Sequence, residues 1–150
     1  MLSLPLMSEK RTEISELGEF KLIDRILEKF ETQQDSTIIG PGDDAAILLP
    51  KETAQVVTTD ILIEGIHFDL AYCPLKHLGY KSVVVNLSDV YAMNAEPKQI
   101  LISLGISNRF SVEAIDELYE GVHLACKEYS VDLVGGDTTA SPKGLVINVV

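Results

Sequence analysis

Apolar positions recur along this chain in two patterns, and each pattern predicts a different kind of element. Short apolar runs bounded by glycine, proline or polar residues are typical of strands. Such runs are TIIG (37–40), AAILLP (45–50), AQVVTTDILIEGIHF (54–68, as two pieces), KQILISLGI (98–106), VDLVGGDTT (131–139) and GLVINVV (144–150). The run at 131–139 is expected to lead into a glycine turn at Gly135 and Gly136.

Three other segments repeat apolar residues at helical spacing. GEFKLIDRILEKF (18–30) and SVEAIDELYEGVHLACKEY (111–129) are amphipathic, and Ser111 is the expected cap of the second. The segment 73–97 is ambiguous, because Val83, Val84 and Val85 favour a strand by propensity. Its length and its stop signal at Asn94–Pro97 favour a helix, and we predict a helix.

Helices and strands therefore follow one another in mixed order, which predicts an α/β (α+β) domain. With 150 residues the chain is long enough to bury a core of its own. We expect a polar leader over residues 1–17 and one domain over residues 18–150. The apolar, strand-like run at 144–150 suggests that this domain is part of a larger fold.

Charge and composition narrow the possible partners. The formal net charge is −11, from 23 acidic and 12 basic residues, which argues against nucleic acid and against an anionic membrane surface. Phosphate ligands would need metal ions as mediators. Cys73 and Cys126 give neither a disulfide framework nor a metal-ligand spacing, and we expect core or half-buried thiols. With no signal peptide or membrane-spanning run expected, the predicted location is the cytoplasm.

Carboxylates stand beside apolar runs at four places. They are Asp43–Asp44, Asp60, Asp89 and Asp137. An aspartate in such a place is costly unless it is paired or bound to a metal, and hard oxygen ligands suit Mg²⁺. Threonine hydroxyls could add oxygens at positions 58, 59, 138 and 139. The alternative is that these acids cap turns or helix N-termini, and the residues alone leave it open.

Other candidate chemistry is sparse. The turns GPGDD and VGGDTT could offer backbone N–H groups to phosphate, but there is no P-loop sequence. His67 lies in an apolar segment, where a histidine is more often a core residue. His77 and His123 are expected at the surface, and no spacing indicates a nucleophile.

Five of these segments, taken together, resemble one enzyme family. GEFKLIDRI, GPGDDAAIL, TTDILIEGIHF, LGYKSVVVNLSDVYAMNAEP and LVGGDTT are similar, in order and at natural spacing, to motifs of the thiamine-monophosphate kinase family. That family belongs to the superfamily of aminoimidazole ribonucleotide synthetase and selenophosphate synthetase. The resemblance implies ATP-dependent phosphorylation of thiamine monophosphate to thiamine diphosphate, with several Mg²⁺ ions.

The resemblance also implies roles for individual residues. Metal ligands are implied at Asp44, Thr58, Thr59, Asp60, Asp89 and Asp137, with Asp43 in a supporting position. A nucleotide contact is implied at Tyr119, Gly136 and Asp137, and His67 would lie near the substrate, against the core interpretation above.

For the fold, the resemblance implies a mixed sheet with helices on one face, which pairs with a second copy into a dimeric β-barrel. Members of the family are about twice as long, so this chain resembles an N-terminal half. Two alternatives remain: another ATP-dependent enzyme of the superfamily, or, for this chain alone, a non-catalytic metal-binding dimerisation module.

Overall fold

The computed structural model describes residues 21, 24–25, 33–39, 45–49 and 54–150. The chain divides into two compact units, residues 1–33 and 34–150. In the first unit Lys21, Asp24 and Arg25 are helical, and the rest of the helix predicted over 18–30 lies outside the described residues, as does the leader. Among the described helices, none has the length and apolar character needed to span a membrane.

The second unit contains two helices and seven strands in its described part. The helices are α3 (Leu75–Ala92) and α4 (Val112–Tyr129). The strands are β1 (Thr37–Ile39), β2 (Ala46–Leu48), β3 (Gln55–Val57), β4 (Asp60–Ile63), β5 (Gln99–Ile106), β6 (Asp132–Ala140) and β7 (Leu145–Val149). The α+β class is confirmed, and so is the helical interpretation of the ambiguous segment.

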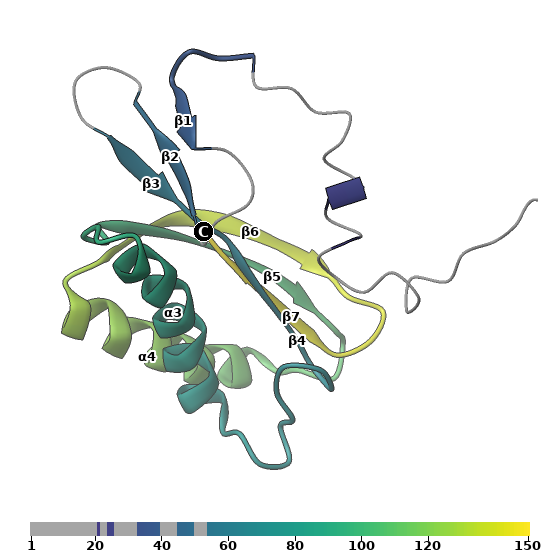
Figure 1. The fold of residues 1–150 in the computed structure, drawn as a ribbon. Coiled ribbons are helices and arrows are strands. Elements are labelled where there is room, and N and C mark those ends of the chain that lie inside the picture. The colour runs from purple at the N-terminus through teal and green to yellow at the C-terminus, as the bar shows by residue number, and fades with distance from the viewer. Residues whose placement is uncertain (1–20, 22–23, 26–32, 40–44, 50–53) are drawn as a thin grey trace, which may run out of the picture. The chain divides into compact units, whose positions relative to one another are not determined.

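The strands form two sheets (Figure 1). The smaller has the order β1-β2-β3 and is antiparallel. The larger has the order β4-β7-β5-β6, in which only β5 and β6 are parallel. Helix α4 makes the crossover between these two strands, as a parallel pair requires. Strand β7, the latest in sequence, lies between β4 and β5.

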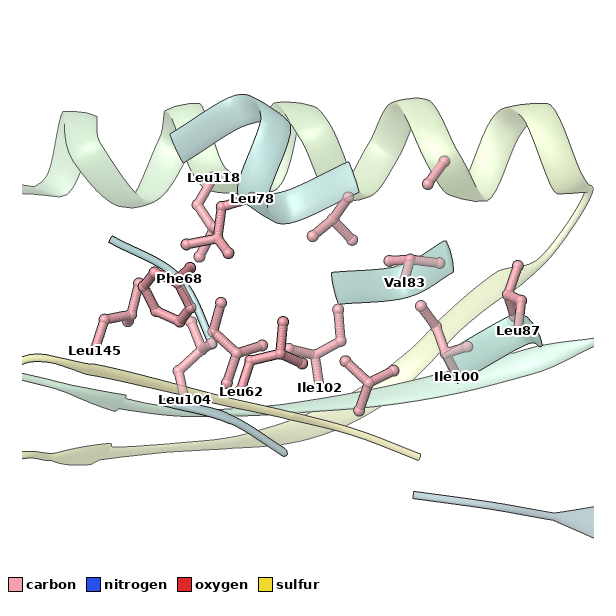
Figure 2. Packing of buried hydrophobic residues seen from close by; sticks show 14 of the residues in the cluster. Leu62, Phe68, Leu78, Val83, Leu87, Ile100, Ile102, Leu104, Leu118 and Leu145 are labelled. Carbon is pink, nitrogen blue, oxygen red and sulfur yellow. The ribbon is translucent and has the colours of Figure 1, made fainter. Parts of the chain in front are cut away.

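Both helices cover one face of the larger sheet, and the core fills the space between (Figures 1 and 2). Alternate residues of the central strands are buried there, because successive side chains of a strand point to opposite faces. From the sheet these are Leu62, Ile100, Ile102, Leu104, Leu145, Ile147 and Val149; from the helices, Leu78, Val83, Leu87 and Leu118. Each such side chain contributes about 1.5–3 kcal/mol by leaving water.

The opposite face of the larger sheet, which we call the open face, keeps apolar side chains at the surface. Ile61 is 52% exposed and Leu101 is 41% exposed. Ser103 and Asn148 lie opposite each other on this face. Each stands between two buried residues of its strand, so its side chain points away from the core. Within the described residues this sheet is open, with β4 and β6 at its edges, so the barrel implied by the resemblance is not formed by one chain.

Helices α3 and α4 cross in close contact at two glycines. A Cβ atom on Gly79 would lie 1.9 Å from the carbonyl oxygen of Leu118, and one on Gly121 would lie 1.8 Å from that of Lys76. The two helix backbones therefore touch directly, and any larger residue would push them apart.

One prediction about the backbone is wrong. Gly135 and Gly136 do not form a turn: both lie inside β6, hydrogen-bonded in register with Leu101 and Ile102. Gly136 is needed for close approach, because a Cβ atom there would lie 1.8 Å from the carbonyl oxygen of Ile102. Only the backbone N–H groups of VGGDTT that face β5 can take part in the parallel strand pair, because β6 is an edge strand with one neighbour.

Candidate functional site

The link between β3 and β4 meets helix α3 through a side-chain hydrogen bond. The hydroxyl of Thr58 donates to Oδ2 of Asp89, at 3.2 Å. Asp60 follows as the first residue of β4, on the core-facing side that it shares with Leu62. Two carboxylates and a hydroxyl, predicted separately as metal ligands, therefore lie together at the end of α3.

Two asparagines fix this region to β7. Asn148 donates from Nδ2 to the hydroxyl oxygen of Thr59 at 2.8 Å and to the carbonyl oxygen of Asp60 at 2.9 Å. Asn86, buried on α3, donates to the carbonyl oxygen of Val149 at 3.2 Å. Because Asp60 pairs with Val149, the helix, β7 and the start of β4 form one connected unit.

The electrostatics of the site favour a cation. Burial and, to a lesser degree, the negative charge of Asp89 raise the pKa of Asp60, while His67 acts in the opposite direction. None of the ion pairs formed among the described residues includes Asp60 or Asp89. Carboxylate and hydroxyl oxygens are the donors that Mg²⁺ prefers, so these residues fit the implied metal.

The described residues supply only part of a full ligand set. They contain no cluster of three or more His, Cys, Asp or Glu side chains arranged to hold an ion. Asp43 and Asp44, the remaining candidates near β2, lie outside the described residues. Among the described residues, no third carboxylate joins Asp60 and Asp89 in such a cluster.

Asp137 is placed apart from this group. It lies on β6, opposite Ser103, and therefore on the open face. Strand β6 is three strand spacings from β4, or roughly 14 Å. The Oδ1 atom of Asp137 accepts a hydrogen bond from the backbone N–H of Thr138 at 2.8 Å. Within one chain, Asp137 and Asp60 cannot share an ion.

Tyr119 borders a second region. It lines a cavity of about 720 Å³ between α4 and the start of β6, together with His123, Cys126, Asp132 and Leu133 among others. Burial raises the pKa of both Tyr119 and Cys126. Gly136 and Asp137 are not among the lining residues, so the structure does not bring the three predicted nucleotide-binding residues into one cavity.

The histidines and cysteines are placed as follows. His67 is exposed, so the interpretation of it as a core residue is wrong, and its Nδ1 atom accepts the backbone N–H of Ile63 at 3.0 Å. His77 and His123 are exposed, as predicted. Cys73 and Cys126 are free and half-buried, which is also as predicted.

Asn148 and Asn86 are supporting residues that were not predicted from the sequence. Asn148 interrupts the apolar run LVINVV, and Asn86 interrupts SVVVNL. A polar residue inside an apolar run needs a hydrogen-bond partner when the run is buried, and that break in pattern was the available indication.

Comparison with known proteins assigns this chain to a family. The family described as AIR synthase related protein, N-terminal domain, matches residues 42–150. The chain belongs to this family. The match includes the β3–β4 link, α3, β6 and β7, which carry the residues discussed above.

Individual proteins similar to this chain are thiamine-monophosphate kinases. The chain is 37% identical over 134 residues to the thiamine-monophosphate kinase of Bacillus subtilis, covering 89% of this chain and 41% of that protein. It is 40% identical over 130 residues to that of Aquifex aeolicus, covering 87% and 40%. The structure of AaThiL complexed with AMPPCP and TMP superposes with a TM-score of 0.82 at 37% identity, covering 93% and 42%. The chain thus spans about two fifths of the length of the curated relatives it matches.

Proposed function

We propose that this chain is the N-terminal, ATP- and Mg²⁺-binding and dimerisation part of an enzyme that phosphorylates thiamine monophosphate to thiamine diphosphate. The observation that carries the proposal is the meeting of Thr58, Asp60 and Asp89 at the end of α3, in a chain that superposes on a relative complexed with AMPPCP and TMP. We further propose a cytoplasmic location.

The proposed roles follow the geometry. Asp60, Asp89 and Thr58, with Thr59 and Asp44, would hold Mg²⁺ at the β3–β4 link, and Asp43 would support Asp44. Asp137 would bind a separate ion with the nucleotide, near Gly136, and Tyr119 would contact the nucleotide. His67 would contact the phosphate monoester. Bound Mg²⁺ would supply charge neutralisation between the two phosphate groups.

The chain's own residues would then position the two phosphate groups and would not themselves react. A phosphate monoester is already anionic at neutral pH and needs no general base, so orientation is the main requirement. Asn148 and Asn86 provide it by holding the start of β4 and the end of α3 on β7. We propose direct transfer without a phosphoenzyme, and trapping a phosphorylated residue during turnover of the full-length protein would contradict this.

Dimerisation is the second part of the proposal. The open face carries Ile61 and Leu101 at the surface, and a second copy packed there would bury them. Closure into the implied barrel would also need strand pairing between the copies at an edge of the larger sheet, β4 or β6. Neither nucleic acid nor membrane is a proposed partner.

A kinase assay with ATP and thiamine monophosphate, on this chain and on a longer chain that covers the length of the relatives, tests the function. Turnover by the longer chain supports it. If both chains bind Mg²⁺ and neither phosphorylates thiamine monophosphate, the chain is better explained as a non-catalytic metal-binding dimerisation module. This module is the second candidate function for the chain alone, because the chain spans only about two fifths of the length of its relatives. Turnover of a different acceptor would favour another superfamily enzyme.

A further inference from the structure

Glu64, at the end of β4, connects three segments that are distant in sequence. Its backbone N–H donates to the carbonyl oxygen of Leu145 at 3.0 Å, and its Oε2 atom accepts the N–H of Leu145 at 2.9 Å. Its Oε1 atom pairs with the guanidinium group of Arg109, in the loop between β5 and α4. The end of β4, that loop and the start of β7 are thereby joined at one carboxylate.

The surroundings of this carboxylate are built to hold it. The Glu64 side chain is only 17% exposed, so its charge needs the partners that it has. Gly144, with φ of +75°, passes so close that a Cβ atom there would lie 3.0 Å from Oε2. The Arg109 guanidinium lies 4.8 Å from the centre of the Phe110 ring, which further restricts it.

The chain turns back directly after Glu64 and brings His67 onto the end of β4. Gly65 donates its N–H to Phe68 at 2.8 Å, and His67 donates its N–H to the carbonyl oxygen of Ile63 at 2.9 Å. Phe68 is buried in the core and closes the turn. Nδ1 of His67 then accepts the N–H of Ile63, so in the neutral imidazole the proton must be on Nε2.

We propose that Glu64 and Arg109 are positioning residues for His67. They fix the turn after β4 so that the imidazole is held as the Nε2–H tautomer, a neutral hydrogen-bond donor for the anionic oxygens of a phosphate monoester. The choice of ligand rests on the proposed function, whereas the fixed tautomer rests on the geometry alone.

The tautomer is tested by long-range ¹⁵N–¹H NMR of the imidazoles in this chain, above the ordinary histidine pKa of about 6.5. Unsubstituted His67 should show only the Nε2–H form. Arg109→Met should give a mixture of both tautomers, and Arg109→Lys should restore most of the single form. Lys76→Met is the matched control: it removes one charge of an exposed ion pair, Lys76 with Glu120, and should change nothing at His67.

A mixture of tautomers in the unsubstituted chain would overturn the proposal, and so would a single Nε2–H form that persists in both Arg109→Met and Glu64→Gln. Because Arg109 is 51% exposed, Arg109→Met is expected to fold, and Glu64→Gln gives the same comparison if it does not.

The ligand is tested separately in the full-length protein. Arg109→Met should raise KM for thiamine monophosphate about tenfold with little change in kcat, the behaviour expected when binding common to ground and transition states is lost. An unchanged KM with a mixed tautomer would overturn the phosphate contact and leave the positioning intact. Absence of turnover in the unsubstituted full-length protein would contradict the proposed function, while the NMR result still decides the tautomer.

Discussion

The hydroxyl of Thr58 donates to the carboxylate of Asp89 across 31 residues of sequence. This bond ties the link between β3 and β4 to the last turns of α3, so the candidate metal ligands come from segments that are distant in sequence. The arrangement brings two carboxylates, Asp60 and Asp89, into one region, where the charge of Asp89 opposes the ionisation of Asp60.

Asp60→Asn should stabilise the chain at neutral pH when divalent metal is absent. The pKa of Asp60 is raised in the folded state, so the folded chain binds more protons than the unfolded chain, and stability falls as pH rises through the folded pKa. Asparagine cannot ionise and avoids this loss. Thermal unfolding at pH 7 should show a melting temperature a degree or more above that of the unsubstituted chain, and the difference should vanish below about pH 4.

Mg²⁺ should make the unsubstituted chain more stable than Asp60→Asn, because an ion that binds only the folded state stabilises it. The unsubstituted chain should gain melting temperature on addition of Mg²⁺, and Asp60→Asn should gain much less. The exposed Glu117→Gln, on α4, is the control and should respond to Mg²⁺ as the unsubstituted chain does. Equal responses of all three would show that Asp60 does not contribute to metal binding.

Asn148→Ala should weaken Mg²⁺ binding without removing a ligand. The substitution deletes the hydrogen bonds to Thr59 and to the carbonyl oxygen of Asp60, which hold the β3–β4 link in place. Loss of such supporting bonds typically costs about 10–100-fold in metal affinity. Isothermal titration with Mg²⁺ measures it, and Ser103→Ala, opposite Asn148 on β5, is the control. If both variants bind equally well, the support comes from elsewhere.

Gly121→Ala should destabilise the chain by about 1–3 kcal/mol, although alanine is the better helix former. A Cβ atom there would lie 1.8 Å from the carbonyl oxygen of Lys76, so α3 and α4 must separate. Urea unfolding followed by circular dichroism gives the free energy. Glu120→Ala, one residue earlier and exposed, should cost less than about 0.5 kcal/mol; a comparable loss in both would remove the steric explanation.

Leu101→Lys should abolish self-association if the open face is the dimer interface. Placing a charge at a position that a second copy would bury is strongly unfavourable. Analytical ultracentrifugation should show a dimer for the unsubstituted chain and a monomer for the variant. Val112→Lys provides the comparison, because Val112 is 73% exposed at the start of α4, away from this face. A dimer that survives Leu101→Lys would place the interface elsewhere.

Much of the fold could be predicted because the apolar pattern is regular. The helix over 111–129 is confirmed with its cap, Ser111, whose hydroxyl accepts the N–H of Ala114 at 3.2 Å. The prediction failed at Gly135 and Gly136, where local sequence indicates a turn. The reason that glycine is needed lies in another strand: Ile102 passes too close for a side chain.

The candidate site could be predicted in its parts and not in its arrangement. The spacing of Thr58, Asp60 and Asp89 along the chain does not reveal that they meet, since that depends on how α3 lies on the sheet. In the same way, Asp137 resembles the others in sequence yet lies on the opposite face, because strand pairing and residue parity decide which face a side chain takes.

Strand β7 has a consequence for the order of folding. It lies between β4 and β5, and its pairing joins Asp60 to Val149 and Ile102 to Val149. On the ribosome, β4 therefore has no neighbour in the larger sheet until residues 145–149 emerge, some eighty residues after it. The late insertion of a central strand predicts slow, non-local closure, and until then the backbone edges of β4 and β5 that face β7 stay unpaired.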